Sequence, residues 1–276
     1  MTGDNVNAIL TIISGVLMEK IHFISGLPRS GTTLLSSILN QNPKFQASVS
    51  GPLARFARAI VEESQSQGGY RYQCPASLRK TIVQNIANTY YADSKPVVFD
   101  TNRGWTYLNP MVSDLYPDAK MIVCIRSIPW IIDSFETLFA KNPYDVPQLF
   151  PQGTGVSVYS RAQYLTDQTS FVGFAYNGVK QAMFGPNKEN IMIVQYDQLA
   201  KNPKLVMKKL YEFIGEPWFE HDFNNVEATW DEFDTDMNIN GLHHVRQKVE
   251  FKERATILPP DLFSHLAQLD FWKQQK

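Results

Sequence analysis

The segment Lys20–Leu39, KIHFISGLPRSGTTLLSSIL, predicts the local structure around which the rest of the chain is organised. The apolar run Ile21–Ile24 predicts a buried strand, and the apolar side chains of Thr33–Leu39 recur at helical spacing. Between them lies a turn rich in Gly, Pro and Ser, Ser25–Gly31. A strand, a glycine-containing turn and a helix together aim several backbone N–H groups at one phosphate, and the helix N-terminus adds partial positive charge there. The segment therefore predicts an anion-binding loop.

The residues of this loop indicate which anion it suits. Gly26 and Gly31 keep the G-x4-G spacing of a Walker A loop, but Thr32 and Thr33 stand where that loop has Lys and Ser or Thr. The missing Lys is the group that reaches the outer phosphates of a nucleoside triphosphate. The cation here is Arg29, which can bond two oxygens of one anion. The loop therefore favours a phosphate-like group other than a triphosphate.

Alternating apolar strands and helical segments predict the fold class. The expected strands are Ile21–Ile24, Lys95–Thr101, Lys120–Ile125 and Asn190–Gln195. Helical patterns lie between them, and the longest, Val156–Phe184, is expected to form one helix. This order predicts a single α/β domain with a parallel sheet of about four to five strands, flanked by helices on both faces. Ligands bind such sheets beyond the carboxyl ends of the strands.

Four polar clusters come directly after the four expected strands. They are the loop itself, Asp100–Arg103, Arg126-Ser127 and Tyr196-Asp197. Because the carboxyl ends of parallel strands meet at one edge, the clusters are expected to form a single active site.

Composition narrows the class of protein. The chain has 276 residues, of which 43% are hydrophobic and 19% charged, as in a globular protein with a substantial core. A net charge of −1 provides no bulk field toward nucleic acid or an anionic membrane. The two cysteines, Cys74 and Cys124, suggest neither a disulfide framework nor a zinc site, so a reducing, cytoplasmic location is expected. The apolar run Ala8–Met18 is too short to span a membrane. Residues 1–17 are treated as an N-terminal extension of a domain formed by residues 18–276.

The sequence GLPRSGTT resembles the 5′-phosphosulfate loop of sulfotransferases that use 3′-phosphoadenosine 5′-phosphosulfate (PAPS). With Pro and Arg before SGTT, it looks most like tyrosylprotein sulfotransferases and the broad bacterial sulfotransferase family. The resemblance extends over most of residues 20–220 and implies PAPS as co-substrate and no metal. The loop residues that it assigns to PAPS are Gly26, Pro28, Arg29, Ser30, Gly31, Thr32 and Thr33.

Three further segments match the family. An Arg after a strand and a Ser eight positions later form the family's 3′-phosphate site, and Arg126 and Ser134 match both in type and spacing. Tyr196 opens a "Y-D/E-x-L…P…F-x-G" pattern; it would contact the nucleotide or be a half-buried aromatic at a strand edge. The late segment Gly241–Arg254 is similar to one that closes over the nucleotide, with Arg246 and Lys248 as donors to the 3′-phosphate, or it is a solvated basic loop.

The general base is where the chain departs from its relatives. Tyrosylprotein sulfotransferases place a catalytic Glu shortly after the first helix, where this chain has QASVSGPL, and cytosolic sulfotransferases use a His after the second strand. Asp100 is the favoured base here, although it would alternatively orient Arg103 or cap a turn. His243 or His244 is the second choice, since imidazole titrates near neutrality. Arg29 and the loop amides would stabilise charge on the transferred group.

The resemblance predicts transfer of the sulfuryl group of PAPS in line to an acceptor hydroxyl or amine, releasing adenosine 3′,5′-bisphosphate. A small-molecule P-loop kinase and a non-catalytic nucleotide-binding relative are the alternatives. The absence of the Walker A Lys counts against the kinase. The absence of the Glu or His that relatives use as the general base supports the non-catalytic relative. The acceptor is left open among small molecules, carbohydrates, lipids and protein tyrosine, as is the oligomeric state.

Overall fold

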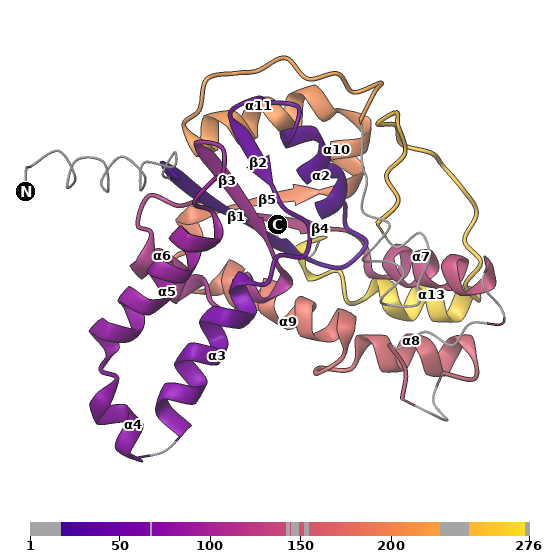
Figure 1. Ribbon diagram of the computed structural model, residues 1–276. Coiled ribbons are helices and arrows are strands. Elements are labelled where there is room, and N and C mark those ends of the chain that lie inside the picture. The colour runs from indigo at the N-terminus through magenta and orange to yellow at the C-terminus, as the bar shows by residue number, and fades with distance from the viewer. Residues whose placement is uncertain are drawn as a thin grey trace, which may run out of the picture.

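Five parallel strands form the centre of the structure, a computed structural model that describes residues 18–66, 68–141, 144, 149–151, 155–226 and 243–273 (Figure 1). The strands are β1 (Lys20–Gly26), β2 (Phe45–Ala47), β3 (Val97–Thr101), β4 (Met121–Ile125) and β5 (Ile191–Gln195). Their order is β2-β3-β1-β4-β5, and every neighbouring pair is parallel. The predicted α/β class is therefore confirmed. The proposed extension, residues 1–17, lies outside the described residues.

The position of β1 at the centre of the sheet organises the site. In the register of the sheet, Ile24 of β1 lies beside Thr101 of β3, and Gly26 lies beside Cys124 of β4. The segments that leave β3 and β4 therefore flank the segment that leaves β1, one on each side. All of them begin at the carboxyl edge, where ligands bind sheets of this kind.

Helices cover both faces of the sheet, because alternate strand residues point to opposite sides. The α-helices are α2 (Thr32–Leu39), α3 (Leu53–Ser66), α4 (Gly68–Gln73), α5 (Ala76–Tyr90), α6 (Asn109–Leu115), α7 (Ile128–Lys141), α8 (Val158–Thr166), α9 (Phe171–Phe184), α10 (Tyr196–Lys201), α11 (Pro203–Ile214) and α13 (Pro260–Ala267). Short 3₁₀ turns are η1 (Arg103–Thr106), η2 (Lys188–Asn190) and η3 (Phe271–Lys273). One buried cluster joins the sheet to α2, α10 and α11. A second joins it to α3, α5, α6, α7, α8, α9 and α13.

Two local expectations differ from the structure. Val156–Phe184 is not one helix: α8 ends at Thr166 and α9 begins at Phe171. Gly173 permits the close packing at this break, because a Cβ there would lie 1.9 Å from the carbonyl oxygen of Asp167. The segment Phe45–Ala47 is a short strand that pairs with β3 and was not expected.

The helices α3, α4 and α5 extend away from the sheet as an arm (Figure 1). Within the described part of the chain, every helix is too short or too polar to cross a bilayer.

Candidate active site

The loop after β1 has the backbone geometry of an anion cradle. Gly26 and Gly31 have φ of 128° and 93°, values that side chains rarely tolerate. A Cβ on Gly26 would lie 2.0 Å from the carbonyl oxygen of Cys124, so only glycine fits where the chain leaves the sheet. Gly31 precedes α2, and no side chain of the described residues caps that helix. The first N–H groups of α2 therefore remain for a ligand anion.

Ser30 supports the loop and does not line the cavity. Its side chain is buried, and Oγ lies 2.5 Å from the carbonyl oxygen of Leu27 and 3.0 Å from that of Cys124. The hydroxyl thus donates within the loop and to β4, so a contact between its side chain and a nucleotide, as the resemblance implied, does not fit this geometry. Of the loop residues that the resemblance assigned to PAPS, Pro28, Arg29, Gly31, Thr32 and Thr33 line the cavity, whereas Gly26 and Ser30 do not.

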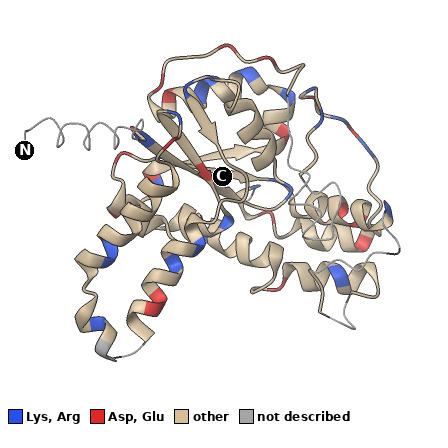
Figure 2. Cartoon of the chain, viewed as in Figure 1, with Lys and Arg blue, Asp and Glu red and all other residues tan. Residues whose placement is uncertain are grey.

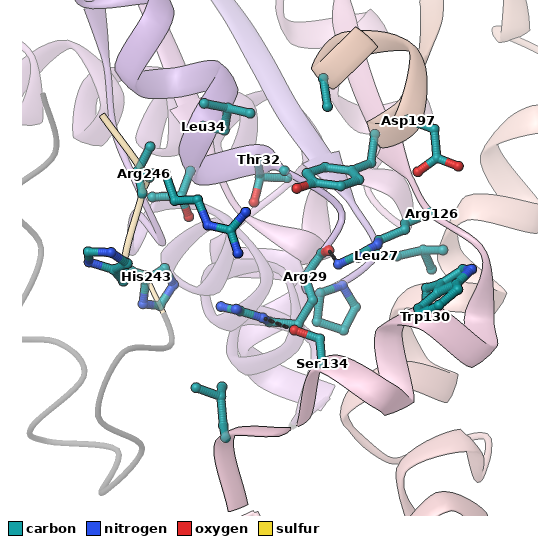
Figure 3. Close-up of a pocket in the computed structure, with 18 of the residues that line it drawn as sticks. Leu27, Arg29, Thr32, Leu34, Arg126, Trp130, Ser134, Asp197, His243 and Arg246 are labelled. Atoms are coloured by element: carbon teal, nitrogen blue, oxygen red, sulfur yellow. Dashed lines mark hydrogen bonds between the residues drawn. The ribbon is translucent and has the colours of Figure 1, made fainter. Parts of the chain in front are cut away.

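Two hydrogen bonds join the two predicted anion motifs (Figure 3). Arg29 donates from Nε to Ser134 Oγ at 3.0 Å, and Arg126 donates from Nη1 to the carbonyl oxygen of Arg29 at 3.2 Å. Arg29 itself has a φ of 58°, which turns its carbonyl toward Arg126 at a cost of about 1 kcal/mol for a left-handed residue. Residues 105 positions apart in sequence are thereby joined in one cationic cluster.

Tyr196 links the loop to this cluster. The guanidinium of Arg126 lies 4.4 Å from the centre of the Tyr196 ring, and a Cβ on Gly31 would be 2.9 Å from the same ring. Burial lowers the pKa of Arg126, and its Nε has no hydrogen-bond partner among the described residues. A buried guanidinium with an open donor is suited to a ligand anion, because an unpaired buried donor costs about 1–3 kcal/mol.

The late basic segment borders the same cavity. His243, His244, Arg246 and Lys248 line it, and Figure 3 shows His243 and Arg246 across the cavity from Ser134. Figure 2 shows blue and red residues alternating along this part of the chain. Gly241, the predicted start of the segment, lies outside the described residues.

A buried carboxylate anchors the end of that segment to α7. Asp133, next to Ser134, forms an ion pair with Arg254. Its Oδ1 also accepts from Thr256 Oγ1 at 2.7 Å and from the N–H of Ile257 at 3.0 Å. No local sequence pattern indicates this contact, because the partners are 123 and 124 positions apart. The segment is therefore held beside the predicted 3′-phosphate residues.

Asp100, the favoured base, does not lie in the cavity. Its carboxylate is fully buried and accepts hydrogen bonds from Tyr91 Oη and Trp105 Nε1, each at 2.7 Å. Burial raises the pKa of Asp100, and these two hydrogen bonds act in the opposite direction. The expectation of a base at this position is corrected, since both oxygens are occupied on the face of the sheet that packs against α5. The two alternative roles expected for Asp100, orienting Arg103 and capping a turn, are not observed either. The carboxylate instead binds the side chains of Tyr91 and Trp105.

The residues after Asp100 do reach the cavity. Thr101, Asn102 and Arg103 line it, and the Arg103 guanidinium lies 3.6 Å from the centre of the Phe171 ring. Arg103 was expected at this edge of the sheet as part of the cluster Asp100–Arg103, but the only role assigned to it was as an alternative partner for Asp100. Its position after the strand was the signal that could have singled it out, as it did for Arg126.

The cavity has a volume of about 1010 Å³. This is at the upper end of the range for small-molecule sites. Its lining joins the segments after all five strands with residues of the segment 243–254. Among the described residues, no group of three or more His, Cys, Asp or Glu side chains could hold a metal ion.

The fold and the loop define a P-loop α/β protein, whose loop geometry at the carboxyl edge of the sheet suits an anion. The chain belongs to the sulfotransferase family, whose sequence profile matches residues 22–220. The predicted resemblance is thus confirmed.

Individual relatives agree with this assignment. Protein-tyrosine sulfotransferase A of Caenorhabditis elegans is 21% identical over 244 residues, which are 80% of this chain and 59% of the relative. The chain therefore spans little more than half of that curated relative. Among solved structures, the sulfotransferase domain from the curacin biosynthetic pathway is similar with a TM-score of 0.55 at 15% identity, covering 93% of this chain and 97% of that one. Mouse sulfotransferase SULT7A1, complexed with PAP, has a TM-score of 0.52 at 13% identity, covering 100% of this chain and 91% of that one. At these identities the structures support the shared fold.

Proposed function

We propose that this protein transfers the sulfuryl group of PAPS to an acceptor hydroxyl or amine and releases adenosine 3′,5′-bisphosphate. One observation carries the proposal: the loop after β1 and the Arg126–Ser134 pair, which suit a 5′-phosphosulfate and a 3′-phosphate, are joined through Arg29 in one cavity. The PAP bound to the similar mouse sulfotransferase adds support for a nucleotide with this pair of phosphates.

PAPS, the sulfuryl donor, would be held mainly by the loop after β1. The N–H groups at the start of α2 and the hydroxyls of Thr32 and Thr33 would donate to the 5′-phosphate and sulfonate oxygens. Arg29 would stabilise negative charge that develops on the sulfonate and the leaving phosphate oxygen. Arg126 and Ser134 would bind the 3′-phosphate, with Tyr196 beneath Arg126. Arg246 and Lys248 would close over the nucleotide from the late segment.

The transfer itself needs a proton acceptor. As the acceptor oxygen or nitrogen bonds to sulfur, the bond between sulfur and the phosphate oxygen breaks, and the acceptor proton passes to a base. The proton acceptors that line the cavity are Asp197, His243, His244, Glu250 and Glu253. Lys252 lies 2.6 Å from Glu250 and lowers its pKa, while Asp197 adjoins the nucleotide residue Tyr196. Among the remaining groups, Glu253, His243 and His244, we propose His243 as the base in place of Asp100, with His244 as the alternative, because His is the side chain that most often serves as a general base.

Three further features belong to the proposal. The reaction would need no metal, because cationic side chains and helix N–H groups supply the positive charge. Residues 18–276 would form the catalytic domain. Two unpaired cysteines, Cys74 and Cys124, support a reducing, cytoplasmic location. The acceptor is a small molecule, a carbohydrate, a lipid or a protein tyrosine; the last is the acceptor in the name of the nematode relative.

Calorimetric titration with adenosine 3′,5′-bisphosphate, beside ADP and ATP, tests the proposal. We expect tight binding of the bisphosphate without added metal and weak binding of the other two. Transfer of radiolabelled sulfate from PAPS to hydroxylated acceptors would then establish the activity. Preference for ATP in the presence of magnesium would instead support a P-loop kinase and overturn the proposal.

A further inference from the structure

Arg103 is a cation in the cavity whose charge no described residue neutralises. No ion pair or hydrogen bond joins its guanidinium to a described residue, and the Phe171 ring covers one face of it at 3.6 Å. Burial lowers the pKa of Arg103 to about 10, which leaves it charged at neutral pH. A partly desolvated guanidinium with open donors is a binding site for an anion, because unsatisfied donors and unpaired charge are both costly.

The backbone of Arg103 is fixed beside the loop. Ser25 Oγ on β1 donates to the Arg103 carbonyl oxygen at 3.2 Å, and Thr106 Oγ1 donates to the same oxygen at 3.1 Å. Arg103 therefore begins η1 at a set position, one strand from the phosphate loop. Fixed backbone and a stacked side chain pre-organise the charge.

The strand order separates this charge from the proposed 3′-phosphate site. Because β1 lies between β3 and β4, Arg103 after β3 and Arg126 after β4 stand on opposite sides of the loop. If the nucleotide extends from the loop toward Arg126, the side next to Arg103 is left for the second substrate.

The lining on that side is cationic. The residues that border the cavity after β2 and β3 are Ser50, Gly51, Pro52, Arg55, Thr101, Asn102 and Arg103. Two of them are charged, and both charges are positive. Asn102 offers little to a ligand, since its side chain donates to the Gly51 carbonyl at 2.6 Å and accepts from the Gly104 N–H at 2.8 Å. This lining would attract a negatively charged substrate and has no carboxylate to repel one.

We propose that Arg103 binds an anionic group of the acceptor, so that the acceptor is a hydroxyl or amine compound bearing a carboxylate, sulfate or phosphate. The inference rests on the proposed function, because it assigns the second substrate of that reaction. Arg103 thereby determines specificity, and Arg55 at the rim adds to the same field.

A matched pair of small probes tests this assignment. The carboxylate 4-hydroxyphenylacetate and its neutral amide, 4-hydroxyphenylacetamide, have the same phenol, separated from the variable group by one methylene. Binding of each to the protein saturated with adenosine 3′,5′-bisphosphate is measured by calorimetry, and sulfate transfer from PAPS is measured in parallel. We expect the acid to bind about 10- to 100-fold more tightly than the amide, as a charge-assisted, two-pronged contact would provide. A sulfonate analogue, 4-hydroxybenzenesulfonate, distinguishes a site for carboxylates from a general anion site.

Variants identify the residue responsible. Arg103→Gln should abolish the preference for the acid while leaving bisphosphate affinity and turnover of the amide within about threefold. Arg103→Lys keeps the charge without the planar fork and should retain part of the preference. The matched control is Arg58→Gln, which removes an exposed α3 arginine paired with Glu62 at 2.6 Å, outside the cavity lining.

The outcomes are separable. Equal binding of the acid and the amide, or no binding of either, would overturn the assignment of an anionic acceptor. An Arg103→Gln variant that loses turnover equally on both probes would also overturn it, because Arg103 would then act on the transferred group. Failure to bind the bisphosphate would instead refute the proposed function itself.

Discussion

Replacing Arg126 with Gln should weaken binding of adenosine 3′,5′-bisphosphate far more than binding of adenosine 5′-monophosphate. The two nucleotides differ only in the 3′-phosphate. In the structure the Arg126 guanidinium donates from Nη1 to the Arg29 carbonyl oxygen and packs on Tyr196, while its Nε has no hydrogen-bond partner among the described residues. The open donor is therefore the part that a ligand phosphate would engage.

The magnitude follows from separating the contacts of Arg126 into two kinds. The bond to Arg29 and the contact with Tyr196 exist without a ligand, so their loss changes the free and the bound protein alike and largely cancels in the affinity. The hydrogen bonds from Arg126 to the phosphate form on binding alone. Hydrogen bonds to charged groups contribute about 1.5–3 kcal/mol, which corresponds to a loss of roughly tenfold to 150-fold in bisphosphate affinity.

Calorimetry on the Arg126→Gln variant and the Arg58→Gln surface control, with both nucleotides, measures this difference. Affinity for the monophosphate should change by less than about threefold in either variant. Salt should weaken the bisphosphate contact in the wild-type protein more than in Arg126→Gln, because a charge is removed. Equal losses for the two nucleotides would refute the reasoning, since they would show that Arg126 supports the loop without contacting the 3′-phosphate.

Three other outcomes are expected. Asp100→Asn should leave turnover within about threefold but lower the free energy of unfolding by roughly 1–3 kcal/mol, because an amide would face one of two buried donors; a large loss of turnover in a folded variant would restore Asp100 as a base. His243→Asn should lower turnover by about 10²- to 10⁴-fold and His244→Asn by little, with unchanged bisphosphate affinity, whereas the reverse would move the base to His244. Burial lowers the pKa of both His22 and His221 to about 4, so between pH 6.5 and 4 the unfolded chain binds protons that the folded chain does not. Stability in urea should therefore be greatest above pH 6.5 and fall by up to about 1.4 kcal/mol per pH unit for each histidine as pH drops; a flat profile would contradict this.

Local sequence patterns, namely apolar runs followed by polar clusters, were sufficient to predict four strands and the position of the site. The apolar runs gave β1, β3, β4 and β5, and each preceded a polar cluster in the sequence. Parallel strands bring their carboxyl ends to one edge, which is why the loop and Arg126 could be placed together. The strand β2 was missed because Phe45–Ala47 has only three residues, too few to show an alternation of apolar and polar side chains. It is a strand because it pairs with β3, which is a tertiary contact.

The error at Asp100 has a specific physical origin. A strand covered on both faces has no polar side, so the apolar run before Asp100 cannot show which way each side chain points. In the structure Val98 and Asp100 share one face, where Asp100 meets Tyr91 and Trp105. One residue later the chain leaves the strand, and the cavity is lined by its successors, Thr101 to Arg103.

Contacts from the C-terminal part of the chain were beyond sequence reasoning, yet they shape the site. Asp270 is buried, accepts from Ser127 Oγ at 2.6 Å and from the Ile128 N–H at 2.8 Å, and so places a carboxylate at the N-terminus of α7. A negative charge there stabilises the helix by about 0.3–2 kcal/mol. Because Ser127 directly follows Arg126, this contact also fixes the turn from which Arg126 enters the cavity. Asp270 lies beyond residues 22–220, the part that matches the family. The family motif therefore supplies the residues that face the nucleotide, while chain outside the motif fixes the helix and turn that orient them.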